Sequence, residues 1–247
     1  MKAVRTAEVR ERLRVAAVQC LARPGELAAA VADHVRWIGA AADSGASVVL
    51  FPELSLTGYE PDAIDLHDIR MSTDDAVLQP LSVVCQQRKV HVFVGAPTAG
   101  AALPQIGVLH VDTRGSVRVA YAKQHLGVGE IGIFSAGTTG AVVGVNGWKL
   151  ALSVCRDAGV AEHRTRAAAA GADAYLVGAL HVIGTEQRLE EQMSAVARTG
   201  MWAVLAQYSG GTGGGPACGQ SGIWRPDGTP VVRLGAGPGM ALADLDV

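Results

Sequence analysis

The chain has 247 residues and a formal net charge of -2; 49% of its residues are hydrophobic and only 4% are aromatic. This length suits one large domain, and the aliphatic composition can fill a sizeable core. The near-neutral charge, with no run rich in Lys or Arg, excludes a typical nucleic-acid-binding protein.

The N-terminal residues 1–12 are polar and charged, without the apolar segment of a secretory signal. They predict a polar arm in front of a single domain that spans residues 13–247. No apolar stretch reaches the roughly 18 residues that cross a bilayer, so we expect a cytoplasmic protein without membrane partners. The four cysteines include no CxxC pair, which argues against a zinc site or a redox dithiol and for reduced thiols: Cys20, Cys85, Cys155 and Cys218.

Apolar periodicity in the first half of the domain predicts alternating strands and helices, followed by consecutive strands. In chain order these are strand 13–20, helix 26–43, strand 47–51, helix 74–88, and strands 90–96, 106–112 and 117–122. Gly45 is a good end for the first helix, because glycine accepts the left-handed backbone that follows many helices. The turn at 112–115 predicts that the last two strands form a hairpin.

The second half continues the mixture of hairpins and crossovers. We expect strands 141–145 and 148–154, helix 162–170, strand 174–177, helix 186–199, and strands 202–207, 219–225, 230–234 and 240–246. Asn146-Gly147 is a strong signal for a type I′ hairpin. The glycine-rich segment 210–215 lacks the Gly-Lys-Ser/Thr of a phosphate-binding loop, so we expect a flexible surface loop. The order predicts an α/β fold with a mixed sheet, or two packed sheets, and helices outside.

Three apolar strands each lead to a reactive side chain: Glu53 follows strand 47–51, Lys123 follows strand 117–122, and Cys155 follows strand 148–154. The carboxyl ends of strands are where α/β folds usually assemble their sites. A thiol, a carboxylate and an amine together suit acyl transfer. The thiol attacks a carbonyl carbon, the carboxylate moves the proton, and the ammonium stabilises the oxyanion and favours the thiolate.

Each of these residues also has an ordinary structural interpretation. A cysteine after an apolar strand is usually part of the core, a glutamate after a strand can cap the next turn, and a lysine there can be solvated. Cys20 also ends an apolar strand, so position alone does not select Cys155.

The local strings resolve this choice. FPELSLTGY spans 51–59, YAKQHL spans 121–126 with Glu130 soon after, and LSVCRD spans 152–157. In this order they resemble the carbon–nitrogen hydrolase family, also called the nitrilase superfamily, and the segment from Gly219 to Gly228 resembles its C-terminal element. The resemblance covers nearly all of residues 13–246 and implies a four-layer α-β-β-α sandwich, with mixed sheets and helices outside.

The resemblance implies a role for each matching residue. Glu53 would be the general base, Lys123 the oxyanion stabiliser and Cys155 the nucleophile. Glu130 would position the lysine and the substrate, and the backbone N–H of Arg156 would complete the oxyanion hole. Tyr59, which closes the first string, is assigned with Glu130 and Arg156 to substrate binding or positioning.

The implied reaction is hydrolysis of a small amide through a cysteine thioester, with neither metal nor organic cofactor. The absence of Cys-Trp-Glu at the nucleophile disfavours a true nitrilase and favours an amidase or an N-carbamoyl amide hydrolase. An acyltransferase and a catalytically silent binding protein remain open. A small-molecule amide is the expected partner, without nucleic acid, and a homodimer or larger homo-oligomer is expected from the family.

Several positions depart from the common family pattern, and we expect them near the substrate pocket. Arg156 replaces a frequent aromatic residue, Val160-Ala161 a frequent Phe-Pro, Gln207 an asparagine, and Gly178 a proline beyond its strand. Two histidines lie near the predicted site. His125 is expected to form structural hydrogen bonds, and His181 is expected in a surface loop, with pocket lining as the alternative.

Overall fold

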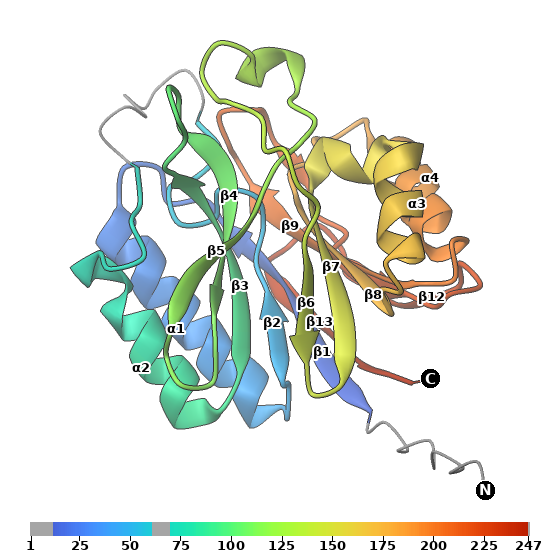
Figure 1. Cartoon of the computed structure of the whole chain (residues 1–247), viewed down its shortest axis with the longest axis horizontal. Coiled ribbons are helices and arrows are strands. Elements are labelled where there is room, and N and C mark those ends of the chain that lie inside the picture. Colours follow the sequence, from blue (N-terminus) through green and yellow to red (C-terminus); the bar gives the residue numbers. More distant parts are fainter. Residues whose placement is uncertain (1–11, 61–69, 247) are drawn as a thin grey trace, which may run out of the picture.

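The structure, a computed structural model, describes residues 12–60 and 70–246. The predicted N-terminal arm therefore lies outside the described residues, apart from Arg12. No helix in the described part of the chain is long and apolar enough to cross a membrane. Figure 1 shows two pairs of helices on opposite sides of the strands, α1 and α2 on one side and α3 and α4 on the other.

The first sheet contains the strands of the N-terminal half and the last strand of the chain. Its order is β5-β4-β3-β2-β1, with β13 beside β1. The strands β1, β2 and β3 are parallel, whereas β4, β5 and β13 join as antiparallel partners. The bounds are β1 Leu13–Leu21, β2 Val48–Leu50, β3 His91–Thr98, β4 Gln105–Val111, β5 Val117–Ala122 and β13 Gly239–Leu245.

The second sheet has the order β6-β7-β8-β9, continued by β11 and β12, with the short β10 also paired to β9. The bounds are β6 Val142–Val145, β7 Trp148–Val154, β8 Ala174–Ala179, β9 Trp202–Gly210, β10 Ala217–Cys218, β11 Gly222–Trp224 and β12 Pro230–Arg233. Strands β7, β8 and β9 are parallel. The two sheets join where Cys20 and Leu21 of β1 pair with Tyr208 and Ser209 of β9.

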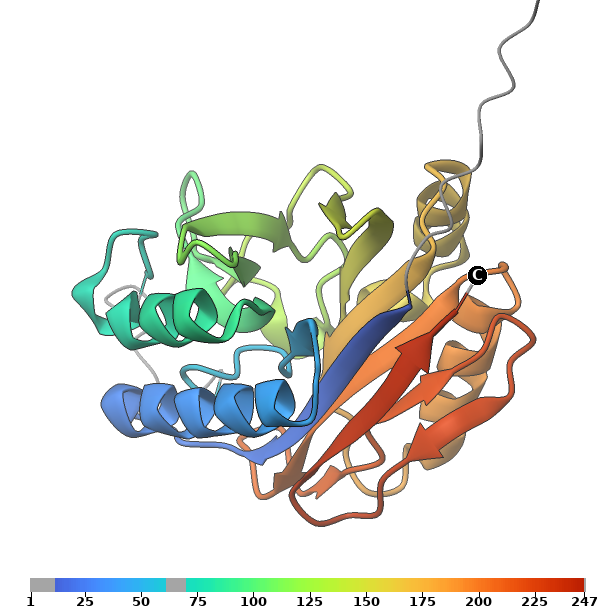
Figure 2. The same cartoon turned by 90° about the horizontal axis from the view of Figure 1, so that it is seen from below.

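Three hydrophobic clusters separate four layers, seen edge-on in Figure 2. One cluster fills the space between the sheets. A second packs the first sheet against α1 (Leu27–Asp43) and α2 (Gln79–Arg88). A third packs the second sheet against α3 (Ala161–Ala169) and α4 (Glu186–Ala197). The expected α-β-β-α sandwich with mixed pairing is therefore confirmed.

Most predicted elements occur within one or two residues of the expected bounds, and two differ for local reasons. The predicted helix 74–88 is a 3-10 turn, η1 (Ala76–Leu78), followed by α2, whose first turn contains Pro80. Proline suits a first helical turn because it has no N–H to donate. The predicted strand 219–225 is shortened to β11, because Gly219 and Gln220 have positive φ and separate it from β10, which lies just before.

Two glycines allow neighbouring strands to approach the turn that carries Glu53. A Cβ on Gly95 of β3 would lie 2.2 Å from the Pro52 carbonyl oxygen. A Cβ on Gly178 of β8 would lie 2.8 Å from the Phe51 carbonyl oxygen. Gly178 lies within its strand, not beyond it as expected. The absence of a side chain at both positions lets the turn sit between the two sheets.

The close approach at Gly95 predicts that Gly95→Ala destabilises the protein by at least about 1–3 kcal/mol, the usual cost of overpacking. Denaturant titration measures the change. Gly144→Ala is the matched control, because Gly144 is an exposed position of β6 and a Cβ there meets no atom within 4 Å. Equal stability of the two variants would contradict this account of Gly95.

Candidate active site

The three predicted reactive residues lie together between the sheets. Glu53 follows β2, Lys123 follows β5, and Cys155 follows β7. The Lys123 Nζ lies 2.6 Å from the Glu53 Oε1 and 2.6 Å from the Glu130 Oε1. Glu53, Lys123 and Glu130 are each no more than 2% exposed. One ammonium thus bridges two buried carboxyl groups.

The charge of Lys123 depends on these neighbours. Burial alone would lower the pKa of its amine, but the neighbouring carboxyl groups of Glu53 and Glu130 raise it above its ordinary value. The side chain is therefore held as an ammonium. Such a buried cation is a strong donor to any oxygen that gains negative charge beside it.

Glu130 is held in place by two further hydrogen bonds. Its Oε2 accepts one from the backbone N–H of Gly127 at 2.7 Å, and its Oε1 accepts one from the Tyr59 hydroxyl at 3.0 Å. Glu130 ends the 3-10 turn η2 (Val128–Glu130). Burial and the nearby carboxyl groups raise the pKa of Tyr59, so its hydroxyl remains a donor. Glu130 and Tyr59 thus lie beside Lys123, as a positioning role requires.

Glu53 has one oxygen engaged and one free. Its Oε1 accepts from Lys123, whereas its buried Oε2 has no hydrogen-bond partner among the described residues. The Tyr208 hydroxyl donates to the backbone carbonyl of Glu53 at 2.7 Å and fixes the turn. Burial raises the pKa of the Glu53 carboxyl to about 7, although Lys123 opposes this shift. A free oxygen with such a pKa suits reversible proton transfer near neutral pH.

Cys155 lies at a strained point of the backbone. Its φ is +47°, in the left-handed region that few residues other than glycine adopt, and it begins the 3-10 turn η3 (Cys155–Gly159). Its Sγ approaches the carbonyl oxygen of Leu180 at 3.7 Å. The sharp turn directs the thiol away from the strand, as expected for a nucleophile that must reach a substrate.

Lys123 lowers the pKa of the Cys155 thiol, as expected for a neighbouring ammonium, but burial and the negative charges of Glu53 and Glu130 outweigh this effect and raise the pKa to about 12. Ionisation of the thiol is therefore disfavoured in this arrangement. The thiol must lose its proton as it attacks, and Glu53 is the neighbouring acceptor.

A cavity of about 210 Å³ opens onto this cluster. Its described lining residues are Glu53, Tyr59, Cys155, Leu180, His181, Val182, Thr185, Arg188 and Gly214. The side chain of Arg156 is exposed and is not among them, so its predicted contact with substrate is not supported through the side chain. Its backbone N–H lies in the first turn of η3, where N–H groups have no acceptor within the turn.

None of the departures from the family pattern lines this cavity, although two of them lie directly behind its walls, near the pocket as expected. Neither Val160 nor Ala161, at the start of α3, is among the residues that line it. Gly178 instead packs beneath the turn of Glu53. Gln207 is fully buried and donates from its Nε2 to the backbone carbonyl of His181 at 3.3 Å. These two residues support the walls of the site and do not form them.

Two segments expected on the surface border the cavity. His181 is 5% exposed and lines the cavity, so the alternative role considered for it is the observed one. In the glycine-rich segment, Gly214 also lines the cavity, and the N–H of Gly213 donates to the Tyr59 carbonyl at 2.9 Å. The loop 210–215 is therefore part of the site.

Sequence reasoning missed Leu180, Val182, Thr185 and Arg188. They follow β8, which runs parallel to β7, so its end lies beside Cys155. The rule that selected Glu53, Lys123 and Cys155 would have found this segment had it been applied to every parallel strand. No reactive residue follows the strand directly, and the segment therefore gave no motif.

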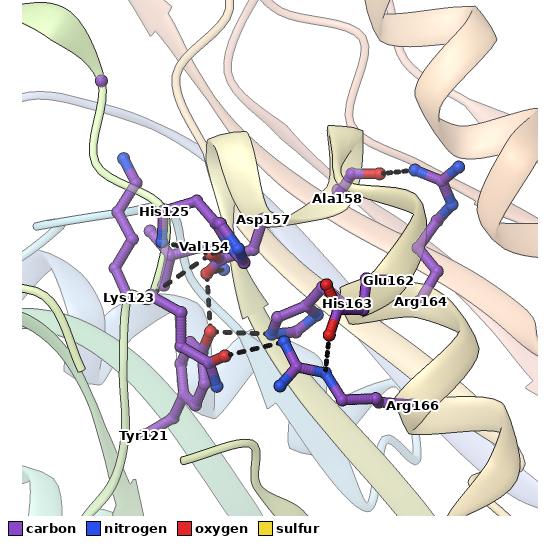
Figure 3. Close-up of polar contacts among 12 residues, drawn as sticks. Tyr121, Lys123, His125, Val154, Asp157, Ala158, Glu162, His163, Arg164 and Arg166 are labelled. Carbon is purple, nitrogen blue, oxygen red and sulfur yellow. Dashed lines mark hydrogen bonds and ion pairs between the residues drawn. The ribbon is translucent and has the colours of Figure 1, made fainter. Parts of the chain in front are cut away.

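Asp157 joins the segment of Lys123 to the turn of Cys155, as Figure 3 shows. Its buried Oδ1 accepts from the backbone N–H groups of Gln124 and His125, at 3.2 and 2.9 Å. Its Oδ2 accepts from the Val154 N–H at 3.1 Å and from the Tyr121 hydroxyl at 2.7 Å. One carboxylate therefore fixes the two catalytic segments relative to each other.

Two histidines complete this network. The His125 Nδ1 lies 2.8 Å from Asp157 Oδ1, a structural contact of the kind expected for this residue. The His163 ring lies between two hydroxyls, 2.9 Å from that of Tyr121 and 2.6 Å from that of Tyr175. Burial lowers the pKa of His163. Within residues 12–60 and 70–246, no group of three or more His, Cys, Asp or Glu side chains is arranged to hold a metal ion.

Comparison with known proteins agrees with this geometry. The carbon-nitrogen hydrolase profile matches residues 14–247. The hydrolase in the pqqF 5′ region of Pseudomonas protegens is 28% identical over 239 residues, which cover 95% of this chain and 83% of that protein.

Solved structures of an amidase from Nesterenkonia sp. AN1 are similar throughout. A double mutant in complex with acrylamide has a TM-score of 0.85 and 27% identity, covering 95% of this chain and 90% of that one. A glutamine mutant carries the acetamide moiety of fluoroacetamide covalently on its active-site cysteine; its TM-score is 0.85 and its identity 27%, covering 98% and 94% of the chains.

The fold and the family match together define a carbon–nitrogen hydrolase. The chain belongs to the carbon-nitrogen hydrolase family, the nitrilase superfamily, and its structural neighbours include amidases.

The contacts of Asp157 predict that Asp157→Asn lowers kcat more than it changes KM. The asparagine amide would point an N–H group at hydrogen-bond donors that the Asp157 carboxylate now accepts from, so Lys123 and Cys155 should shift relative to each other. The cavity wall after β8 should be unchanged. Stability should fall by about 1–3 kcal/mol. Steady-state kinetics on the folded variant measure the split. Tyr121→Phe, which removes one donor only, should be milder; a kcat for Asp157→Asn equal to wild type would reject the positioning role.

Proposed function

We propose that the protein hydrolyses the carbon–nitrogen bond of a small amide through a thioester on Cys155. The observation that supports this most strongly is the bridged pair Glu53–Lys123, which is buried against the cavity that also exposes the Cys155 thiol. The site thus brings together a proton acceptor (Glu53), a fixed cation (Lys123) and a nucleophile (Cys155). The small cavity and the acrylamide, butyramide and fluoroacetamide adducts or complexes of the Nesterenkonia amidase favour a small amide.

In the first half-reaction, the Cys155 sulfur forms a bond to the amide carbon as its proton passes to the free oxygen of Glu53. The carbonyl oxygen gains negative charge and accepts hydrogen bonds from Lys123 and from the backbone N–H of Arg156. Glu53 then gives its proton to the nitrogen. The carbon–nitrogen bond breaks, and ammonia or an amine leaves the thioester behind.

In the second half-reaction, Glu53 takes a proton from a water molecule whose oxygen attacks the thioester. The carbon–sulfur bond breaks and Glu53 returns the proton to sulfur, which restores the thiol and releases the acid. Throughout, Lys123 keeps its proton and Glu130 keeps Lys123 in place. Transfer of the acyl group to an added amine instead of water would identify an acyltransferase on the same three residues.

The double use of Glu53 predicts that Glu53→Gln slows amide turnover by about 100-fold or more, because the isosteric amide cannot accept a proton. An activated ester bypasses the protonation of the leaving group, so with this substrate the variant should accumulate acyl-enzyme on Cys155. Ammonia release and intact-protein mass spectrometry measure the two effects. Glu162→Gln, at an exposed position of α3, is the control. Normal turnover by Glu53→Gln would refute the base assignment.

The raised pKa of Glu53 also predicts the pH dependence of kcat/KM. Below about pH 7 the carboxyl is protonated and cannot accept the thiol proton, so kcat/KM should fall by about tenfold per pH unit well below this value. A glutamate with an ordinary pKa of about 4.3 would keep activity down to about pH 5. A pH profile measured at low substrate concentration distinguishes the two cases, and a flat profile between pH 5 and 7 would argue against the buried base.

A further inference from the structure

One wall of the cavity has no part in the bond-breaking chemistry. It is formed by the segment from Leu180 to Arg188, which runs from the end of β8 into the first turn of α4. Glu53 contributes a carboxyl group to the lining of the cavity, whereas this wall contributes the guanidinium of Arg188. The lining therefore contains ionisable groups of both signs.

Arg188 is the cation on this wall. Its side chain is exposed, and no hydrogen bond or ion pair to it occurs within the part of the chain that the structure describes. Two acidic residues are equally near in sequence, and both have other partners: Glu186 accepts from the backbone N–H of Gly184 at 2.8 Å, and Glu190 pairs with Arg233 at 2.6 Å. Other arginines pair with carboxylates even where they are exposed, as Arg114 does with Asp112. Arg188 keeps its guanidinium available at the cavity.

Two further features of this wall favour an anionic group. His181 is nearly fully buried beside Arg188, and its Nε2 has no hydrogen-bond partner among the described residues. Thr185 lines the cavity at the N-terminus of α4, a helix of 12 residues whose first N–H groups point out of the helix. A helix N-terminus carries a partial positive charge that attracts anions.

We propose that the substrate is an amide whose acyl chain ends in a carboxylate, such as the monoamide of a short dicarboxylic acid, and that Arg188 binds this carboxylate. The inference rests on the proposed function, because the amide end must lie at Cys155. The buried Nε2 of His181 and the N-terminus of α4 lie on the same wall. The anion neutralises Arg188 and stays away from the carboxyl groups of Glu53 and Glu130.

The test compares three amides with the same number of carbon atoms and different charges at the far end: glutaramate (anionic), pentanamide (neutral) and 5-aminopentanamide (cationic). We expect kcat/KM to fall in this order, with glutaramate favoured over pentanamide by about 2- to 5-fold at low salt, the range for an exposed ion pair. The preference should shrink as ionic strength rises. Arg188→Gln should abolish it, and Arg188→Lys should retain part of it.

Arg198→Gln is the matched control, since it removes the same charge from the other end of α4, where Arg198 is exposed and does not line the cavity. It should keep the glutaramate preference. Turnover of pentanamide without any preference for glutaramate, or a preference that survives Arg188→Gln, would overturn the inference and leave the amidase proposal intact.

If none of the three amides is hydrolysed, the amidase proposal fails for this substrate size, and calorimetric binding to the wild-type protein still tests the anion site. Tighter binding of glutaramate than of pentanamide, lost in Arg188→Gln, supports the site. Equal binding of the two compounds rejects it.

Discussion

The buried ammonium of Lys123 is the constraint on which the rest of the site depends. It satisfies carboxyl groups from two separate segments, the turn after β2 and the 3-10 turn η2. Without it, two acidic groups would share a nearly water-free space, and such unpaired burial is among the most costly arrangements in a protein. The Tyr59 hydroxyl and the Gly127 N–H donate hydrogen bonds to Glu130, and the Tyr208 hydroxyl donates one to the backbone carbonyl of Glu53. These contacts hold the two residues whose carboxyl groups pair with Lys123.

The same cluster explains why the nucleophile rests as a thiol. Two carboxyl groups against one ammonium make further negative charge at sulfur unfavourable, and burial adds to the cost. The electrostatics therefore protect Cys155 from ionising in the empty site and couple its ionisation to attack on a carbonyl. When the sulfur attacks, the negative charge develops on the carbonyl oxygen of the substrate, where Lys123 can stabilise it.

The fold and the cluster of Glu53, Lys123 and Cys155 could be predicted from the sequence because both rest on local signals. Apolar periodicity located the strands, and each of the three residues comes within three positions of the end of one. The cavity wall could not be predicted in this way. Arg188 lies in an ordinary amphipathic helix and reaches the site only because β8 is parallel to β7. The structural role of Gly178 can be recognised only from the position of the Glu53 turn that packs against it. The pKa of the Cys155 thiol depends on distances between segments far apart in the chain.

The base and the cation belong to the first sheet and the nucleophile to the second, yet the described hydrogen-bonded pairing between the sheets is confined to a short contact of β1 with β9. The distance from thiol to carboxyl is thus maintained by apolar packing between two stacked layers together with the hydrogen bonds of Asp157 and of the Tyr208 hydroxyl. Because such packing is non-directional, substitutions that reduce the side-chain volume between the sheets would allow the two layers to slide. The hydrogen bonds between strands within each sheet would be retained. Substitutions deep in that interface can silence the enzyme without unfolding either sheet.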